Sequence, residues 1–182
     1  MKNSRKIQVG VMGSAADLNY SGKIEKLAFD IGSLIAKSGN ITVYGAEKDY
    51  DSLSTTAAKG AKSKDGLTVG ITYGKGKDIW DQEGNTDVII ATGIERGGGR
   101  EFVLVNSCDV LIIISGGSGT LTETGIAYQM NIPVIAMKGT GGWADKLADT
   151  YIDGRERFKV ISATTAEEAV GTALKLAEEY NK

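Results

Sequence analysis

The residues whose types and spacing best suit chemistry form one glycine-rich segment, residues 115–123, with the sequence S-G-G-S-G-T-L-T-E. The segment lies between a run of apolar residues and a stretch with helical periodicity. Glycines let the backbone approach a ligand closely, and the start of a helix offers unpaired N–H groups and the positive end of the helix dipole. This combination favours a phosphate group. The residues that we expect to contact a phosphorylated ligand here are Gly116, Gly117, Ser118, Gly119 and Thr120.

The segment differs from the two common nucleotide-binding motifs. No G-x-G-x-x-G sequence follows a predicted strand, and no G-x-x-x-x-G-K-[ST] sequence occurs in the chain. The first motif is the dinucleotide-binding fingerprint, and the second is the P-loop of many ATPases and GTPases. The sequence therefore argues against NAD binding and against ATP hydrolysis.

Glu123 ends the segment and has two interpretations. Thr120 and Glu123 have the spacing of a helix capping box, which also occurs at Thr165 and Glu168 without glycines around it. Alternatively, Glu123 places a carboxylate about one turn from a bound phosphate, where the sugar of a nucleotide would lie. The surrounding glycines favour this second interpretation.

Arg100 is the second candidate residue. It follows Gly97, Gly98 and Gly99 at the predicted start of a helix, where a cation opposes the helix dipole. A surface ion pair with Glu95 or Glu101 is one explanation, and anion binding is the other. We favour anion binding, because an arginine at this position does not stabilise the helix.

Arg100, fifteen positions before Ser115, and the following G-G-x-G-T-x-x-E sequence resemble the core of the LONELY GUY family. These are cytokinin-activating nucleoside 5′-monophosphate phosphoribohydrolases of the lysine-decarboxylase-like Rossmann superfamily, to which molybdenum cofactor carrier proteins are also similar. The resemblance extends to residues 13–14, 60–61 and 133–135. The chain looks most like a poorly characterised prokaryotic branch of this superfamily.

The resemblance implies a role for each matching residue. Residues 116–120 would bind the 5′-phosphate together with Gly13 and Ser14, Glu123 would act at the ribose, and Arg100 would position the nucleotide. Cleavage of an N-glycosidic bond builds positive charge on the sugar, which a carboxylate stabilises while it orients the attacking water. The resemblance also implies a homodimer or a larger homo-oligomer.

The chain departs from the family pattern at several positions. Ser115 stands in place of a proline, Glu101 in place of a lysine, and Gly97 and Gly98 in place of Met-His. The second glycine-rich loop of the family is replaced by residues 44–51, Y-G-A-E-K-D-Y-D, whose acidic groups we expect to repel a phosphate. The altered loop therefore favours a ligand other than a cytokinin precursor.

Two functions follow from these residues. The first is metal-free hydrolysis of a purine-type nucleoside 5′-monophosphate to the base and ribose 5-phosphate, with Glu123 and Arg100 as catalytic residues. The second is a non-catalytic carrier or sensor of a phosphorylated ligand, either a nucleotide or a molybdopterin-type cofactor. Neither function of the protein itself requires a resident cofactor, and we expect none.

Short β-branched runs alternate with longer segments of helical periodicity, which indicates βαβ units. We predict a Rossmann-like, three-layer, doubly wound α/β fold with a mainly parallel sheet of six or seven strands. The predicted strands are residues 7–12, 41–44, 67–72, 87–91, 110–115, 133–137 and 158–161. The predicted helices are residues 22–37, 52–63, 99–106, 121–131, 143–150 and 166–181. Ligands of such sheets bind at the carboxyl ends of the strands, where three of the glycine clusters fall.

Composition sets the remaining expectations. The chain has 182 residues, 41% of which are hydrophobic, and it contains 21 basic and 23 acidic side chains. This length predicts one domain covering residues 1–182, and the balanced charge argues against a nucleic-acid or membrane partner. Histidine is absent, which excludes imidazole bases and histidine-bound metals. Cys108 is the single cysteine, so an internal disulfide and a cysteine zinc cluster are excluded, and we expect a reducing, cytoplasmic location.

Overall fold

The computed structural model describes residues 5–15, 19–81, 83–95 and 99–180, and in these residues seven parallel strands form one sheet. The strand order is β4-β3-β2-β1-β5-β6-β7, and every neighbouring pair is parallel. The strands are β1 (Gln8–Gly13), β2 (Ile41–Gly45), β3 (Leu67–Thr72), β4 (Val88–Ala91), β5 (Val110–Ile114), β6 (Val134–Met137) and β7 (Ile161–Ala163). The Rossmann-like α/β fold expected from the sequence is confirmed.

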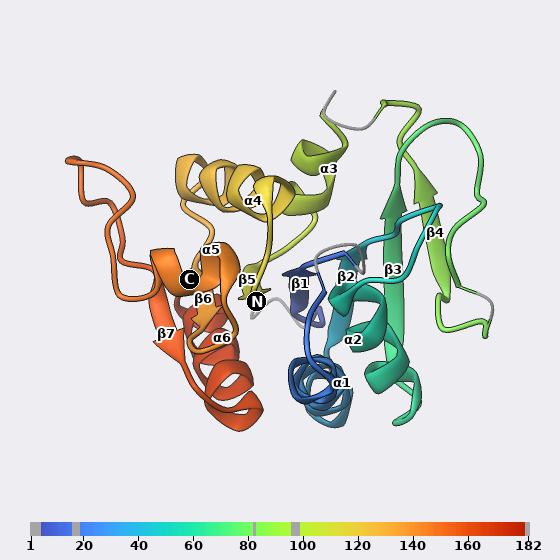
Figure 1. The fold of residues 1–182 in the computed structure, drawn as a ribbon, viewed down its shortest axis with the longest axis horizontal. Coiled ribbons are helices and arrows are strands. Elements are labelled where there is room, and N and C mark those ends of the chain that lie inside the picture. Colours follow the sequence, from blue (N-terminus) through green and yellow to red (C-terminus); the bar gives the residue numbers. More distant parts are fainter. Residues whose placement is uncertain (1–4, 16–18, 82, 96–98, 181–182) are drawn as a thin grey trace.

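Helices cover both faces of the sheet, as Figure 1 shows. The helices are α1 (Gly22–Lys37), α2 (Leu53–Lys62), α3 (Arg100–Asn106), α4 (Ser118–Gln129), α5 (Gly142–Leu147) and α6 (Ala166–Tyr180). The core on one face is formed with α1, α2 and α6, and the core on the other face with α3, α4 and α5. Every residue of β5 is buried, which explains why its sequence is apolar without alternation.

Local sequence signals place several boundaries correctly. The α1 helix covers the expected residues, buries Ala28, Ile31 and Ile35 against the sheet, and ends before Gly39, whose φ angle is +78°. That angle lies in the left-handed region, which glycine adopts without a steric cost and which ends many helices. A periodic apolar face and a glycine stop were therefore sufficient to predict this helix.

Several element boundaries differ from the prediction, most clearly those of α4, α5 and β7, and α5 ends at Leu147 and not at position 150. The α4 helix begins at Ser118, three residues before the expected start, because Gly117 forms its N-cap and the Ser-Gly-Thr sequence is its first turn. The last strand is Ile161–Ala163 and not residues 158–161. Phe158 instead packs against the ring of Tyr128, with the ring centroids 5.2 Å apart. Position 181, at the end of the last predicted helix, lies outside the described residues.

The strand order fixes where a ligand site should lie. From β1 the chain proceeds through β2 and β3 toward one edge of the sheet, and from β5 through β6 toward the other edge. The carboxyl ends of β1 and β5 therefore flank the point where the winding direction reverses. In doubly wound sheets this point leaves a crevice that binds ligands.

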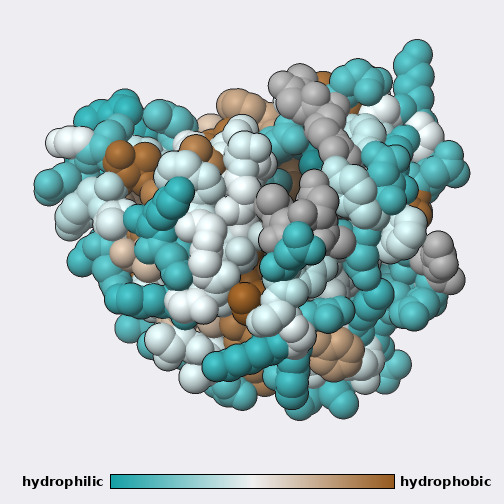
Figure 2. Space-filling view, viewed as in Figure 1, coloured by the Kyte–Doolittle hydropathy of each residue, from teal (hydrophilic) through white to brown (hydrophobic). Residues whose placement is uncertain are grey.

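The surface in Figure 2 is mostly polar, with hydrophobic residues in small, separate patches. None of the described helices combines the length and the apolar character needed to cross a membrane. Among the described residues, no cluster of three or more cysteine, aspartate or glutamate side chains is arranged to hold a metal ion.

Helices α1 and α2 pack at unusually close range, and this contact gives a stability prediction. A Cβ atom added at Gly32 would lie 1.8 Å from the carbonyl oxygen of Ala57, and one at Gly60 would lie 1.9 Å from that of Phe29. We expect Gly32→Ala to lower the free energy of unfolding by about 1–3 kcal/mol, because the helices must separate. Gly171→Ala is the matched control, because Gly171 is helical with open space around it and alanine should stabilise that site by up to about 1 kcal/mol. Urea unfolding of both variants measures the difference, and equal stability of the two would contradict the close-packing explanation.

Candidate functional site

The loops after β1, β5 and β6 are tied together at the carboxyl edge of the sheet. The hydroxyl of Ser14 donates to Oγ of Ser115 at 3.0 Å and accepts from the backbone N–H of Gly116 at 2.9 Å. The N–H of Ser115 donates to Oγ1 of Thr140 at 2.7 Å. Ser115 adopts a left-handed conformation with a φ angle of +54°. These bonds hold the backbone of the glycine-rich segment in one conformation.

The glycine cluster after β6 packs against that segment. A Cβ atom at Gly142 would lie 2.5 Å from the carbonyl oxygen of Gly116. That carbonyl accepts from the N–H of Trp143 at 3.0 Å, and the carbonyl of Ser115 accepts from the N–H of Ala144 at 2.9 Å. The start of α5 is therefore a support for the segment, and the glycine permits the close approach.

The first turn of α4 presents backbone donors. Gly117 is the N-cap, and no side chain of the described residues caps the helix. Because a helical N–H donates four residues back, the N–H groups of Ser118, Gly119 and Thr120 have no acceptor within the helix. All three residues line a cavity. The capping-box interpretation of Thr120 and Glu123 is wrong, because the helix starts before Thr120.

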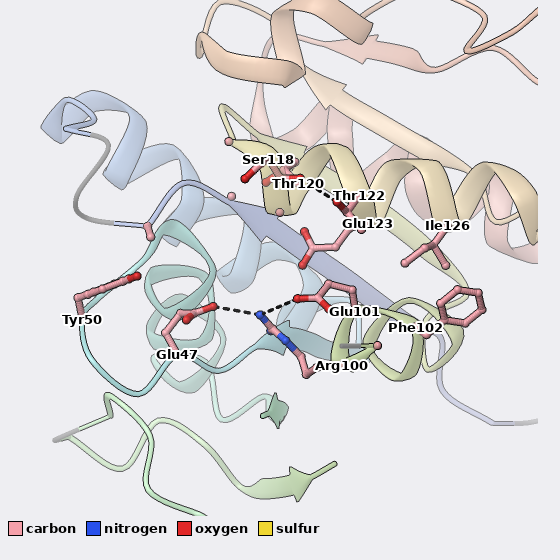
Figure 3. Close-up of a pocket in the computed structure, with 15 residues that line it drawn as sticks. Glu47, Tyr50, Arg100, Glu101, Phe102, Ser118, Thr120, Thr122, Glu123 and Ile126 are labelled. Atoms are coloured by element: carbon pink, nitrogen blue, oxygen red, sulfur yellow. Dashed lines mark hydrogen bonds and ion pairs between the residues drawn. The ribbon is translucent and has the colours of Figure 1, made fainter. Parts of the chain in front are cut away.

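The cavity has a volume of about 660 Å³ and lies at the reversal point of the sheet. Figure 3 shows that side chains from α3, α4 and the loop after β2 surround it. The residues that line it are Gly13, Ala15, Glu47, Tyr50, Gly99, Arg100, Glu101, Phe102, Gly117, Ser118, Gly119, Thr120, Thr122, Glu123 and Ile126. Its volume is in the range of pockets that bind small molecules and cofactors.

Arg100 is buried, with 4% of its surface exposed, so the surface location considered for its ion pair is wrong, although Glu101, one of the two partners considered, does lie within ion-pair distance. Its Nη2 atom lies 3.1 Å from Oε1 of Glu47 and 3.6 Å from Oε1 of Glu101 (Figure 3). Its Nε and Nη1 atoms are buried, and no described residue accepts a hydrogen bond from them. A Cβ atom at Gly45 would lie 2.2 Å from Nη1, so the glycine at the end of β2 makes room for the guanidinium.

Glu123 projects from α4 into the same space as the guanidinium of Arg100, as Figure 3 shows. Only 8% of its surface is exposed. Burial raises the pKa of Glu123 to about 7, Arg100 opposes the increase, and the charges of Glu101 and Glu47 add to it. A carboxyl group with this pKa can accept or donate a proton near neutral pH, which is the property required of a general acid or base.

Of the residues predicted for the site, seven line the cavity: Gly13, Arg100, Gly117, Ser118, Gly119, Thr120 and Glu123. Ser14 and Gly116 do not line it, and their mutual hydrogen bond shapes the segment behind it. Gly97 and Gly98 lie outside the described residues. Sequence reasoning missed Gly45 and Glu47 as partners of Arg100, although their position at and just after the carboxyl end of β2, the strand next to β1, was an available signal.

The raised pKa of Glu123 makes a testable prediction about stability. In the unfolded chain the pKa returns to about 4.5, so between about pH 4.5 and 7 the folded state holds a proton that the unfolded state has lost. Stability therefore falls as the pH rises through this interval, by about 3 kcal/mol at most. We expect Glu123→Gln to raise the free energy of unfolding at pH 8 by about 1–3 kcal/mol, and by less than about 1 kcal/mol at pH 5.

Urea unfolding at the two pH values measures this effect. Glu178→Gln is the control, because Glu178 is an exposed carboxylate on α6 and its loss should change stability little at either pH. If the Glu123→Gln variant is less stable than wild type at pH 8, the ionised carboxylate of Glu123 does not destabilise the folded protein.

The protein therefore has a Rossmann-like α/β fold, with a cavity at the point where the winding direction of the sheet reverses. The first turn of α4, which has no side-chain cap, faces this cavity. The SLOG cluster4 family model matches residues 6–170, and the chain belongs to this family. An uncharacterized protein of Archaeoglobus fulgidus is 34% identical over 132 residues, which cover 72% of this chain and 80% of that protein.

Solved structures show the same relationship. The X-ray structure of TM1055 is 28% identical with a TM-score of 0.81, covering 93% of this chain and 99% of that one. The molybdenum cofactor carrier protein of Chlamydomonas reinhardtii is 28% identical with a TM-score of 0.77, covering 94% and 98%. The molybdenum cofactor binding protein of Rippkaea orientalis is 26% identical with a TM-score of 0.77, covering 95% and 98%. The expected superfamily and the expected similarity to molybdenum cofactor carriers are confirmed.

Proposed function

We propose that the protein binds a phosphorylated organic ligand, a nucleotide or a molybdopterin-type cofactor, in the cavity at the carboxyl ends of β1 and β5. The phosphate lies against the first turn of α4, and the remainder of the ligand extends toward Arg100 and Glu123. The observation that carries this proposal is the uncapped start of α4, whose first-turn residues Ser118, Gly119 and Thr120 line the cavity. Similarity to two molybdenum cofactor proteins over nearly their whole length supports it.

A second function, N-glycosidic hydrolysis of a nucleoside 5′-monophosphate, is favoured by one specific observation. Glu123 is a buried carboxyl group with a pKa of about 7, and it shares the cavity with Arg100. In this reaction the Glu123 carboxylate stabilises the positive charge that develops on the sugar and orients the water that attacks it. Arg100 positions the nucleotide. The products are the free base and ribose 5-phosphate.

One experiment separates the two functions. The protein is titrated calorimetrically with the 5′-monophosphates of adenosine, guanosine, cytidine and uridine, and with the nucleosides as unphosphorylated controls. Each mixture is then analysed by chromatography for free base. Binding of monophosphates but not of nucleosides, without release of base, supports the carrier. Release of base that Glu123→Gln abolishes, with nucleotide affinity within a few fold of wild type, supports the hydrolase.

Binding of nucleosides and monophosphates with equal affinity would contradict the phosphate site. The expected cytoplasmic location and homo-oligomeric state stay predictions.

A further inference from the structure

A small polar chamber of about 40 Å³ adjoins the main cavity. Arg100 and Glu123 line both spaces, and Ser52 and Ser54, at the start of α2, line the chamber only. Residues 117–120, against which we place the phosphate, line the main cavity and not the chamber. The chamber therefore receives the end of a ligand that lies opposite its phosphate.

Arg100 brings hydrogen-bond donors to this chamber that need an acceptor. Its Nη2 atom is engaged by the carboxylates of Glu47 and Glu101. Its Nε and Nη1 atoms are buried, and no described residue accepts a hydrogen bond from them. A guanidinium does not lose its proton in a protein, so it remains a donor at every relevant pH. A ligand group that fills the chamber must supply an acceptor, because buried donors without one destabilise the complex.

Glu123 does not impose the opposite requirement. Burial raises the pKa of Glu123 to about 7, so its carboxyl group takes up a proton near neutral pH and then both donates and accepts. The donors of Arg100 therefore decide which ligand group fits. An oxo oxygen suits them, because it accepts hydrogen bonds through two lone pairs and carries no proton. An amino group presents its own N–H donors to Nε and Nη1.

In both proposed kinds of ligand, the end opposite the phosphate is a heterocyclic ring. Hypoxanthine, guanine and pterin each carry an oxo group beside a ring N–H, whereas adenine carries an amino group beside an unprotonated ring nitrogen. In complexes with DNA, arginine pairs with the O6 and N7 atoms of guanine, and glutamine or asparagine pairs with adenine. The chamber holds about one or two water-sized groups, which admits the substituted edge of a ring.

We infer that the chamber selects ligands whose ring carries an oxo group, a 6-oxopurine or a pterin, over adenine nucleotides, and that Arg100 is the selecting residue. The oxo oxygen accepts a hydrogen bond from Nε or Nη1 of Arg100, and the neighbouring ring N–H donates to the carboxylate of Glu123. The inference rests on the proposed function, because it assumes that the phosphate lies at α4 and the ring points toward Arg100.

The test compares inosine 5′-monophosphate with adenosine 5′-monophosphate by calorimetry at pH 8. The two nucleotides differ only in the oxo or amino group of the purine and in the proton on the adjacent ring nitrogen. We expect wild type to bind inosine 5′-monophosphate at least about tenfold more tightly, since a hydrogen bond to a charged group is worth about this factor. Purine riboside 5′-monophosphate, which lacks the group altogether, should also bind more weakly than inosine 5′-monophosphate.

Gly45→Ala tests the role of Arg100 while keeping its charge. The added Cβ atom would lie 2.2 Å from Nη1, so the end of the guanidinium must move. We expect the preference for inosine 5′-monophosphate to fall below about threefold. Gly171→Ala is the matched control, because Gly171 lies on α6 with open space around it, and it should keep the wild-type preference. Arg100→Gln is a second variant with the same expected direction, because an amide both donates and accepts.

Thermal unfolding establishes that each variant is folded. Equal affinity of wild type for the inosine and adenosine nucleotides overturns the inference and leaves the phosphate site intact. An unchanged preference in both Gly45→Ala and Arg100→Gln overturns the role of Arg100. Equal affinity for inosine and inosine 5′-monophosphate would instead contradict the proposed phosphate site. Binding of none of the nucleotides counts against a nucleotide ligand, and the inference fails with it.

Discussion

Replacing Gly119 by aspartate is expected to weaken binding of adenosine 5′-monophosphate about 100-fold or more without unfolding the protein. Gly119 lies in the first turn of α4 and lines the cavity, and a Cβ atom added there meets no atom within 4 Å. The aspartate carboxylate would stand next to the bound phosphate, and two such charges repel by several kcal/mol at an effective dielectric constant of about 20. The same carboxylate is favourable for the helix, because it lies at the positive end of the dipole.

The control is Gly119→Ala, which adds the Cβ atom without the charge. It should raise the melting temperature slightly, because alanine favours the helix by up to about 1 kcal/mol, and it should leave affinity within a few fold. Calorimetry and thermal unfolding measure both properties. If Gly119→Asp and Gly119→Ala bind the nucleotide equally, the phosphate does not lie at this helix start.

Replacing Arg100 by methionine is expected to have the largest effect on stability. The substitution leaves the carboxylates of Glu47, Glu101 and Glu123 near one another, with no other basic side chain among the described residues that line the cavity. Removing one partner from a buried ion pair costs about 3–5 kcal/mol, because the remaining charge stays uncompensated. We expect a loss of this size at pH 8 and a smaller loss at pH 5, because the pKa of Glu123 is about 7 and this carboxyl group is protonated at pH 5. Urea unfolding at both pH values gives the result.

Arg100→Lys is the matched control, because it keeps the positive charge and removes the planar fork. It should recover much of the stability at pH 8 but not the full ligand affinity, since an ammonium group cannot replace the directed guanidinium donors. Equal losses for methionine and lysine would mean that Arg100 stabilises the protein through packing and not through its charge.

Much of the fold could be predicted because each element carries its own signal. The unbroken apolar run of β5 indicates a strand covered on both faces, and the apolar stripe of α1 with Gly39 after it indicates both the helix and its end. The start of α4 could not be placed, because glycine disfavours helices in general and only the backbone conformation at Gly117 shows where the first turn begins.

Part of the candidate site could be predicted, because some of its residues lie close together in the sequence. The glycine-rich segment and Glu123 are neighbours in sequence, so their proximity follows from one turn of helix. The partnership of Arg100 with Glu47 joins residues 53 positions apart and depends on how the loop after β2 meets α3. From the sequence alone, the acidic groups of residues 44–51 are expected to repel a phosphate. In the structure, the carboxylate of Glu47 in this loop forms an ion pair with the guanidinium of Arg100.

A crystal structure of the protein with adenosine 5′-monophosphate tests the central claim most directly. We predict phosphate oxygens within about 3 Å of the backbone nitrogens of Ser118, Gly119 and Thr120, with the sugar or base directed toward Arg100 and Glu123. A nucleotide whose phosphate lies away from the first turn of α4, or one bound outside the cavity, would contradict the account.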